Sequence, residues 1–368
     1  MKILMIGGTG TISYDATKFF VSKGHEVYLL NRGNRNDLKY DNLHYIIGDA
    51  NDLDSLDNAL KDFTFDVIFD FIIFTVEQMK MRLKVYDGKC KQFFFISSAT
   101  VYQLIDGVID ENIPITNDTW KYSREKIECE NWLTSHSYSF ENTIIRPYVT
   151  YDNRRIPFPV ITKKSYYTLV DRIKRGKPII ICGDGNNILT LTHTKDFAVA
   201  LEGLIMNSKA FNQAFHITGG CETTWNDIIG YVFAVMEKKT DIVYIPVERL
   251  AEYFPSEKDE LLYDKSQNHR FDNSKICDAV PSFKSDISVE EGIKNTTHYL
   301  LTHADLQKID GLWNAKIDVI IEEYEKSCGH IKHKASIRAK MLYYIYEKTS
   351  WNFLKRVLDK IRHMRGRL

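Results

Sequence analysis

The sequence predicts an α/β fold in which helices cover both faces of a doubly wound parallel sheet. Two observations indicate this fold. Apolar runs of strand length alternate with amphipathic stretches of helix length through the first half of the chain. These runs are apolar throughout instead of alternating with polar residues, as expected of parallel strands that are buried on both faces.

The first three elements form a β-α-β unit. We expect a strand at residues 2–7 ("KILMIG"), a helix at 14–24 ("YDATKFFVSKG") and a second strand at 25–33 ("HEVYLLNRG"). Later apolar runs extend the sheet, and they read "LHYIIGD", "FDVIFDFIIF", "KQFFFISSA" and "ENTIIRPYV".

The domain organisation follows from a change of pattern near residue 150. We expect residues 1–150 to form the sheet-bearing domain, with segments near 185–220 returning to it. Residues 151–300, where prolines interrupt the alternation, are expected to form a smaller α/β subdomain. Residues 301–368 have a helical pattern and are expected to form a C-terminal extension with a basic tail.

The composition excludes several classes of protein. There are 49 basic residues (Lys and Arg) and 49 acidic residues, so the overall charge gives no indication of nucleic-acid binding. The six cysteines are scattered without zinc-ligand spacing, which favours reduced thiols in a cytoplasmic protein and no metal site. No apolar run approaches the roughly 18 residues of a membrane span.

A glycine-rich turn lies between the first strand and the first helix. Glycines there allow a close approach of the backbone to a pyrophosphate, and the helix N-terminus adds amide donors and a positive dipole. Ser13 stands where a third glycine is usual. An ordinary glycine turn is the alternative. The strand-turn-helix context favours a dinucleotide site made by Gly7, Gly8, Thr9, Gly10, Thr11 and Ile12.

The end of the second strand distinguishes between nicotinamide cofactors. An acidic residue there binds the ribose 2′-hydroxyl of NAD, whereas an arginine accommodates the 2′-phosphate of NADP. This sequence has Asn31 at that point, followed by Arg32 and Arg35, so NADP is favoured over NAD. The alternative is that both arginines are solvated loop residues. Asp49 and Ala50 end the third apolar run and are expected near the adenine ring.

Tyr122 and Lys126 are four residues apart in "KYSREK", which places them on one face of a helix. Tyrosine titrates near pH ~10, so its pKa must fall by roughly three units if it is to act as a base near neutral pH. A neighbouring ammonium can supply part of that shift. A pair that only covers a helix surface is the alternative.

These residues and further motifs resemble the extended short-chain dehydrogenase/reductases, the NAD(P)-dependent sugar epimerase/dehydratase family. The resemblance covers residues 1 to about 300 and implies a Rossmann-like fold. Its motifs lie in the family's order, and they are "GGTGTIS", "GDAND", "ISSATVY", Tyr122-x-x-x-Lys126, "IIRPYVTYD", "CGDGNNILTLTHTKDFAVA", "FHITGG" and "FDNSKI".

The resemblance implies a catalytic triad of Ser98, Tyr122 and Lys126. In this triad Tyr122 is the acid/base, and Ser98 hydrogen-bonds a substrate hydroxyl or carbonyl. Lys126 would bind the nicotinamide ribose and, with the oxidised ring, favour tyrosinate. The adjacent Ser97 is expected to point to the opposite face, because side chains alternate along a strand.

Departures from the family pattern bear on the substrate. Its 4,6-dehydratases have an Asp-Glu pair where this sequence has Ala99 and Thr100, which disfavours that dehydration, and "SSATVY" is similar to the 4-epimerases. The family's arginine after "GDG", which commonly binds a nucleotide diphosphate, is Leu189. Arg146 is expected to be structural. The candidate substrate-binding residues are Ser98, Thr100, Arg154, Arg155 and Arg270.

We therefore expect an NAD(P)-dependent oxidoreductase or epimerase that acts on a sugar or sugar nucleotide by tyrosine-assisted hydride transfer, with a role in surface polysaccharide biosynthesis. The resemblance also implies a homodimer. A sugar-nucleotide dehydratase is one alternative. An RNA-binding protein on the same fold is another, since "NRG" and "FDFIIF" are similar to a divergent branch that includes chloroplast RNA-binding proteins. The intact triad and balanced charge disfavour nucleic acid as a partner.

The tail, residues 331–368, has eleven Lys or Arg residues against two acids. Its apolar residues recur mostly at three- and four-residue steps, as in an amphipathic helix. Such a basic helix can lie on an anionic membrane surface, or it can dock on its own domain or on a second subunit. The apolar stripe consists of Ile337, Met341, Tyr344, Ile345, Trp351, Leu354, Leu358 and Ile361.

Overall fold

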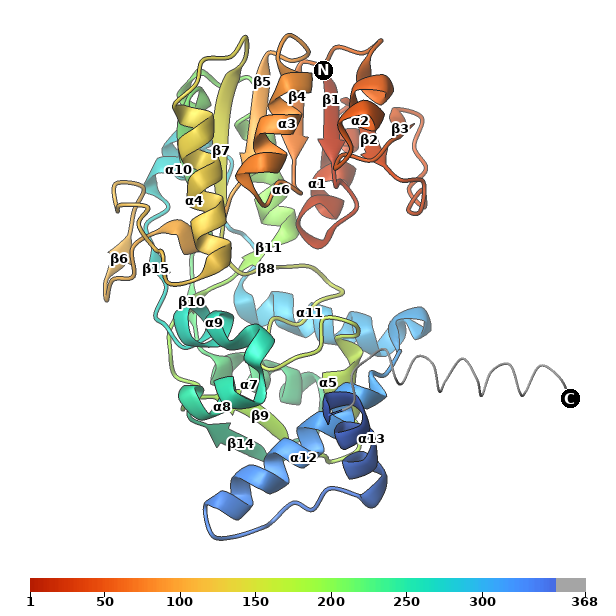
Figure 1. The fold of residues 1–368 in the computed structure, drawn as a ribbon, viewed down its shortest axis with the longest axis vertical. Helices are drawn as coiled ribbons and strands as arrows, with labels where there is room; N and C mark the ends of the chain where they lie inside the picture. Colours follow the sequence, from red (N-terminus) through yellow and green to blue (C-terminus); the bar gives the residue numbers. More distant parts are fainter. Residues whose placement is uncertain (349–368) are drawn as a thin grey trace, which may run out of the picture.

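The computed structural model describes residues 1–348, and it has the doubly wound α/β fold expected from the sequence (Figure 1). Seven strands form one sheet in the order β12-β7-β5-β4-β1-β2-β3, and every neighbouring pair is parallel. The chain begins in the middle of this sheet and adds strands on both sides. The strands are β1 (Lys2–Ile6), β2 (Glu26–Asn31), β3 (Leu43–Ile47), β4 (Val67–Asp70), β5 (Gln92–Ile96), β7 (Glu141–Pro147) and β12 (Gln213–Ile217).

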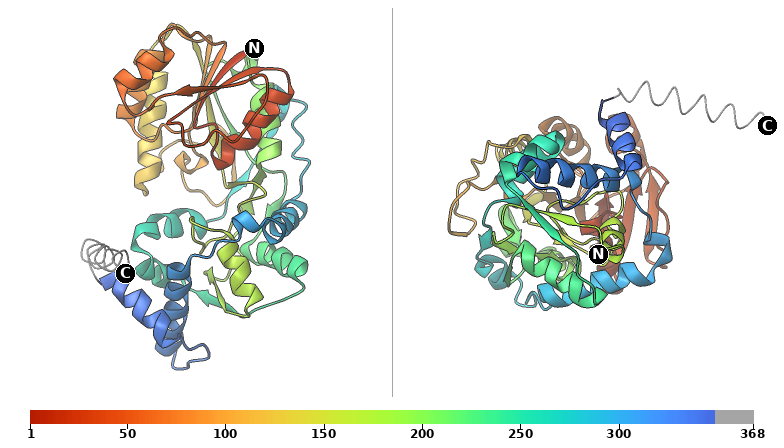
Figure 2. Two further views of the ribbon diagram at one scale, coloured as in Figure 1. Left: turned by 90° about the vertical axis from the view of Figure 1, so that its right-hand side faces the viewer. Right: turned by 90° about the horizontal axis from the view of Figure 1, so that it is seen from below.

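Helices cover both faces of the sheet (Figure 2). One face carries α1 (Thr11–Ser22), α6 (Thr194–Gly203) and α10 (Ser274–Ala279). The other face carries α2 (Leu53–Leu60), α3 (Val76–Tyr86) and α4 (Lys121–Thr134).

Alternate residues of each strand contribute to one of two apolar layers. In β1, Ile3 and Met5 pack on the side of α1 and α6, whereas Leu4 and Ile6 pack on the side of α2 and α3. All four side chains are fully buried. Burial on both faces explains why these strands read as continuous apolar runs in the sequence.

Below the carboxyl edge of the sheet lies a smaller part built from short strand pairs and helices (Figure 1). The parallel pairs are β8 (Thr150–Tyr151) with β11 (Thr192–His193), β9 (Ile179–Cys182) with β14 (Ile242–Ile245), and β6 (Val108–Ile109) with β15 (Arg270–Phe271). The antiparallel pair is β10 (Leu189–Thr190) with β13 (Glu222–Thr223). The helices are α5 (Tyr167–Lys174), α7 (Trp225–Met236), α8 (Val247–Tyr253), α9 (Lys258–Glu260) and α11 (Val289–Thr302), and a π-helical turn, Leu261–Lys265, follows α9.

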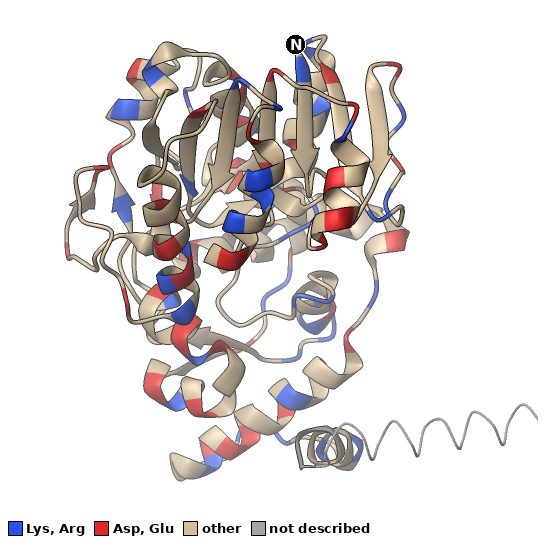
Figure 3. Cartoon of the chain, turned by 45° about the horizontal axis from the view of Figure 1, so that its top comes forward, with Lys and Arg blue, Asp and Glu red and all other residues tan. Residues whose placement is uncertain are grey.

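The C-terminal extension consists of α12 (Gly311–Ser327) and α13 (Ile337–Lys348), which packs against α12. Acidic residues lie along α12 (Figure 3), and α13 carries Arg338 and Lys340. Lys340 Nζ lies 2.7 Å from Glu322 Oε1, and His333 Nδ1 lies 2.6 Å from Glu325 Oε1. The described part of the tail therefore docks on its own chain, as one of the two alternatives expects.

The predicted apolar stripe of the tail is not the docked face of α13. Among residues 337–345 of α13, Ala339 is buried, whereas the stripe residues Ile337, Met341, Tyr344 and Ile345 are exposed. Tyr344 Oη nevertheless donates to Glu323 Oε1 of α12 at 3.2 Å. The remaining members lie outside the described residues, and they are Trp351, Leu354, Leu358 and Ile361. Within residues 1–348, no helix combines the length and the apolar character needed to span a bilayer.

A buried ion pair fixes the carboxyl end of β4. Arg82 and Asp70 are both fully buried, and Arg82 Nη1 lies 2.7 Å from each carboxylate oxygen of Asp70. Tyr86 Oη donates to the same carboxylate at 2.8 Å. The guanidinium also donates to the Ala50 carbonyl at 3.1 Å and to Asn51 Oδ1 at 2.9 Å. It thereby joins β4, α3 and the loop after β3.

Substitution Arg82→Ala should lower the free energy of unfolding by about 3–5 kcal/mol, because it leaves the Asp70 carboxylate buried without its counter-charge. Urea denaturation followed by circular dichroism measures this loss. Lys91→Ala is the matched control: its ion pair with Asp66 is largely exposed, so we expect a loss of about 0–1 kcal/mol. Equal losses in the two variants would contradict the structural role of Arg82.

Candidate active site

The glycine turn between β1 and α1 has the geometry that a pyrophosphate site needs. Gly7 has a φ of +78°, a left-handed conformation that favours glycine. A Cβ on Gly8 would lie only 2.5 Å from Leu29 Cδ2, so the turn packs directly against β2. Helix α1 begins at Thr11, and its first amides are therefore available at the turn. The residues present fit a dinucleotide.

Ser13 closes the glycine turn from inside. Its Oγ donates to the Gly7 carbonyl at 2.6 Å and accepts from the Gly10 amide at 3.0 Å. Thr17 Oγ1 donates to the Gly8 carbonyl at 2.7 Å. The serine that replaces the usual third glycine thus stabilises the turn through hydrogen bonds to its backbone.

Asn31, Arg32 and Arg35, which lie at or after the end of β2, differ in their contacts with the glycine turn. Asn31 folds into its own loop, where Oδ1 accepts from the Gly33 amide at 2.7 Å. Arg35 Nη1 donates to the Thr9 carbonyl at 3.4 Å. Arg32 is exposed. The structure therefore brings Arg35 to the glycine turn and leaves Arg32 in solvent.

The loop after β3 lies at the same edge of the sheet. The Asp49 amide donates to Ser55 Oγ at 2.9 Å, and Asp49 Oδ1 accepts from the Asn51 amide at 2.9 Å. The Ala50 carbonyl accepts from Arg82 Nε. Asp49 and Ala50, the residues expected near the adenine ring, therefore lie in a loop that is held by the guanidinium of the buried Arg82–Asp70 ion pair.

The three predicted catalytic residues meet between the end of β5 and the start of α4. Ser98 precedes the short 3₁₀ turn Ala99–Val101, and its Oγ accepts from Thr100 Oγ1 at 2.9 Å. Tyr122 lies in the first turn of α4, close enough to Ser98 for the two hydroxyls to interact. Lys126 follows one turn later, with Nζ 5.8 Å from the centre of the Tyr122 ring. One compact site holds all three.

Lys126 is fully buried, and two backbone carbonyls hold its ammonium. Its Nζ donates to the Ile73 carbonyl at 2.6 Å and to the Ile96 carbonyl at 2.7 Å. These two bonds leave one of the three N–H groups for a ligand hydroxyl. Burial lowers the pKa of Lys126 to about 8.

The expectation that Lys126 lowers the pKa of Tyr122 is wrong for the chain taken by itself. Burial raises the pKa of Tyr122, the hydrogen bond to Ser98 lowers it, and the carboxylates of Asp264 and Glu260 raise it further, with a net upward shift. Lys126 donates its N–H groups to backbone carbonyl oxygens and not to the phenol. Burial is therefore the main influence on the pKa of Tyr122.

Ser97 points away from this site, as strand alternation predicts. Its Oγ donates to Glu130 Oε1 at 2.5 Å, and Glu130 Oε2 lies 2.6 Å from Arg146 Nη2. All three side chains are buried. Arg146 therefore belongs to a buried ion pair, which agrees with the structural role expected for it.

Two of the candidate substrate-binding arginines are paired with carboxylates of their own chain. Arg154 Nη2 lies 2.5 Å from Asp152 Oδ2, and its guanidinium stacks 4.3 Å from the centre of the Tyr14 ring. Arg270 Nε lies 3.1 Å from Glu222 Oε1. The predicted arginine cluster therefore does not form one anion site.

Arg155 and Thr100 line different cavities. Arg155 shares a small cavity with Glu260 and Lys265. Thr100 lines a cavity of about 250 Å³ that is also lined by His269. The structure thus separates these two predicted residues.

Sequence analysis did not single out three buried residues of the smaller part, one of which, Asp264, acts on the pKa of Tyr122. Asp264 and His269 come from the segment "YDKSQNH" (263–269), and Tyr148 comes from "RPYV". A polar run between two apolar segments is typical of a surface loop. Its burial beside Tyr122 depends on contacts between distant parts of the chain.

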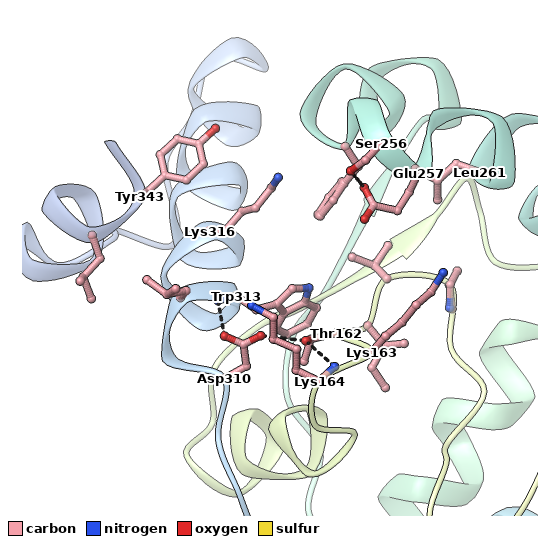
Figure 4. Close-up of a pocket in the computed structure, with 16 residues that line it drawn as sticks. Thr162, Lys163, Lys164, Ser256, Glu257, Leu261, Asp310, Trp313, Lys316 and Tyr343 are labelled. Atoms are coloured by element: carbon pink, nitrogen blue, oxygen red, sulfur yellow. Dashed lines mark hydrogen bonds between the residues drawn. The ribbon is translucent and has the colours of Figure 1, made fainter. Parts of the chain in front are cut away.

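A larger cavity, of about 430 Å³, lies between α12, α13 and the α8–α9 segment (Figure 4). Lys316 and Tyr343 line one side, Ser256 and Glu257 the other, and Trp313 the floor. The catalytic candidates do not line this cavity, so it is not the catalytic site. Among residues 1–348, no group of three or more His, Cys, Asp or Glu side chains is placed to hold a metal, and the six cysteines form no disulfide.

The fold and the glycine turn define a dinucleotide-binding α/β protein. The model of the NAD dependent epimerase/dehydratase family matches residues 3–217, more than half of the chain. The chain belongs to this family.

One relative of known name is the chloroplast stem-loop binding protein of 41 kDa b from Arabidopsis thaliana. It is 28% identical over 240 residues, which cover 62% of this chain. The same alignment covers 61% of the relative, so this chain spans about three fifths of that protein's length.

Solved structures of low sequence identity share the fold. An epimerase from Methanothermobacter thermautotrophicus is 18% identical with a TM-score of 0.69, covering 83% of this chain and 93% of its own. UDP-glucuronic acid 4-epimerase from Bacillus cereus, in complex with NAD, is 18% identical with a TM-score of 0.65 (84% and 100% covered). UDP-glucose 4-epimerase from Thermus thermophilus, also in complex with NAD, is 15% identical with a TM-score of 0.66 (83% and 100% covered).

Substitution Lys126→Met should change how stability depends on pH. The folded protein releases the Lys126 proton near pH 8, whereas the ordinary value is about 10.5, so the unfolded chain binds more protons between these values. The stability contributed by Lys126 is therefore fully present above about pH 10.5 and is lost as the pH falls through about 8. The wild type should gain up to about 3 kcal/mol relative to the variant across this window.

Urea denaturation of both proteins at pH 7.5 and at pH 10 measures this difference. The groups that both proteins share cancel in the comparison. A difference in unfolding free energy that is the same at the two pH values would contradict the lowered pKa of Lys126.

Proposed function

We propose that the protein is an NAD(P)-dependent oxidoreductase or epimerase that acts on a sugar or sugar nucleotide by tyrosine-assisted hydride transfer. The observation that carries this proposal is the convergence of Ser98, Tyr122 and Lys126 at the carboxyl edge of the sheet. Membership of the family and the likeness to UDP-sugar 4-epimerases that bind NAD support it. Surface polysaccharide biosynthesis is a setting in which such a reaction is needed.

Each residue has a defined task in this reaction. The glycine turn binds the pyrophosphate, and the remaining N–H of Lys126 binds a ribose hydroxyl. Tyr122 takes the proton from a substrate hydroxyl, and Ser98 hydrogen-bonds the same oxygen. The dinucleotide, when bound, supplies the hydride carrier. In its oxidised form it also supplies a positive charge, which would lower the raised pKa of Tyr122.

NADP is the cofactor we favour within the NAD-type class. Asn31 lacks the carboxylate that would accept from the 2′-hydroxyl of NAD. Arg35 lies at the glycine turn and can pair with a 2′-phosphate. A reductase would use NADPH once per turnover, whereas an epimerase would recover its hydride. We also propose that the protein is a cytoplasmic homodimer, as the family resemblance implies.

Substitution Tyr122→Phe should abolish hydride transfer, with a rate loss of at least about 10²-fold, because it removes the proton acceptor. Binding of NADPH and NADH should stay within about twofold, since the proposed pyrophosphate site is the glycine turn before α1, whereas Tyr122 lies in α4. Fluorescence of the reduced cofactors measures both affinities. UDP-glucose, UDP-glucuronic acid and free hexoses are the substrates to test. Absorbance at 340 nm measures net oxidation or reduction, and chromatography of the sugars measures epimerisation, which leaves the cofactor unchanged.

Lys121→Ala is the matched control, because Lys121 lies in the same helix turn and is exposed. It should leave both readouts unchanged. A fully active Tyr122→Phe protein, or a wild type that binds neither cofactor, would refute the proposed function.

An RNA-binding protein on the same fold is the second candidate. The name of the Arabidopsis relative, a stem-loop binding protein, favours it. The pairing of Arg154 and Arg270 with carboxylates opposes it, because phosphate contacts need available cations. Salt-dependent RNA binding that is lost on removal of residues 331–368, with no dinucleotide affinity, would establish this candidate.

We further propose peripheral membrane contact through residues 331–368. The exposed apolar side chains of α13 and the basic residues around them support it. The double substitution Ile337→Glu/Met341→Glu should reduce pelleting of the full-length protein with phosphatidylserine vesicles by about tenfold or more. Both side chains are mainly exposed, at 79% and 58%, so the fold should remain intact.

The control for the membrane experiment is Ile47→Glu/Val108→Glu, at 60% and 57% exposure on other surfaces. It should pellet like the wild type. Pelleting that is unchanged in the α13 variant would refute membrane contact and leave the docked arrangement of the tail.

A further inference from the structure

The π-helical turn after α9 buries two ionisable side chains next to the candidate active site. Asp264 is 4% exposed and Lys265 is 9% exposed. Asn187 Nδ2 and Trp225 Nε1 each donate to the Lys265 carbonyl at 2.9 Å, so the turn is held firmly in place. Isolated π-turns are rare and are frequent at functional sites. None of the catalytic steps described above uses Asp264 or Lys265.

Three buried polar atoms near this turn lack a hydrogen-bond partner within the described chain: Asp264 Oδ1, His269 Nε2 and Tyr148 Oη. The three residues lie together. His269 Nε2 is 3.6 Å from Asp264 Oδ1, and the ring centres of Tyr148 and His269 are 4.6 Å apart. Buried polar groups are ordinarily satisfied, so a cluster of unsatisfied atoms needs polar groups from outside the chain.

The cluster faces the catalytic candidates. His269 and Thr100 both line the cavity of about 250 Å³, and Thr100 hydrogen-bonds Ser98. Asp264 is also close enough to Tyr122 that its carboxylate acts on the pKa of the phenol. A molecule in this cavity would therefore touch His269 of the cluster and Thr100, the hydrogen-bond partner of Ser98.

The charges around the cluster are already balanced. Lys265 contacts the Asp264 carboxylate, and its Nζ lies 3.6 Å from Glu260 Oε1. Lys163 Nζ lies 2.8 Å from Glu260 Oε2. Arg155 acts on the same Glu260 carboxylate, lowering its pKa. A diphosphate needs cations that are free to pair with it, whereas hydroxyl groups need neighbouring donors and acceptors.

We propose that Asp264, His269 and Tyr148 bind the hydroxyl groups of a sugar ring that carries no nucleotide diphosphate, and that they hold this ring against Tyr122. Asp264 accepts from a ring hydroxyl. The imidazole and the phenol each accept from, or donate to, a neighbouring hydroxyl. Burial lowers the pKa of His269, so the imidazole is neutral near pH 7 and offers both roles. The inference rests on the proposed function and narrows its substrate class.

The decisive variant is Tyr148→Phe in the full-length protein loaded with NADP. Its hydroxyl makes no hydrogen bond of ordinary geometry within residues 1–348, although it interacts with the Asp264 carboxylate, so its removal should change the melting temperature little. Saturation-transfer NMR with a mixture of D-hexoses and hexosamines measures sugar binding. We expect the transferred signal to fall about tenfold in Tyr148→Phe, and similarly in Asp264→Asn, as the loss of a hydrogen bond to the ligand implies.

Tyr151→Phe is the matched control. Tyr151 is equally buried in the same part of the protein, and its Oη also has no partner within the described residues. It packs against His193, away from the cluster. This variant should bind the sugars like the wild type.

The outcomes separate this inference from the proposed function. If the protein binds a dinucleotide but gives no sugar signal, the inference alone is overturned. The same holds if the sugar signals are equal in wild type, Tyr148→Phe and Asp264→Asn. UDP-glucose binding that is tighter than that of any free sugar and unaffected by Tyr148→Phe also overturns it. A protein that binds no nicotinamide dinucleotide refutes the proposed function, whatever the sugar signals are.

Discussion

The buried guanidinium of Arg82 is the interaction on which the candidate site depends. It holds the carboxylate of Asp70 at the end of β4 and the carbonyl of Ala50 in the loop after β3. The same carboxylate accepts from the Ile72 amide at 2.9 Å, which sets the direction of the chain into Ile73. The Ile73 carbonyl in turn binds the ammonium of Lys126. One ion pair therefore fixes both the adenine-side loop and the lysine beside the catalytic phenol.

Much of the cofactor half could be predicted because its signals are local in sequence. The glycine turn, the end of β2 and the pair Tyr122/Lys126 each lie within one turn or one helix, so spacing alone determines which side chains share a face. The apolar runs indicated the sheet for a similar reason, since burial on both faces leaves a continuous pattern. The family resemblance added Ser98, which the structure places in contact with Tyr122.

The substrate half could not be predicted, because its chemistry depends on contacts between distant segments. The carboxylates of Asp264 and Glu260 reach Tyr122 from more than a hundred residues away in sequence, and with burial they reverse the expected pKa shift. Likewise, Arg270 reads as a free cation until β15 brings it to Glu222. Helix α13 gives a third case, since its apolar spacing indicated either a membrane-facing or a docked stripe, and the structure leaves this stripe mostly exposed.

The path of the chain between the two parts has a mechanical consequence. The backbone leaves the large sheet after β7, returns for α6 and β12, leaves again for β13 and returns once more for α10 before reaching α11 (Figure 1). Closure around a bound molecule would therefore require several connecting segments to change their backbone angles together. A single protease cut in one of these segments would leave the others still joining the two parts.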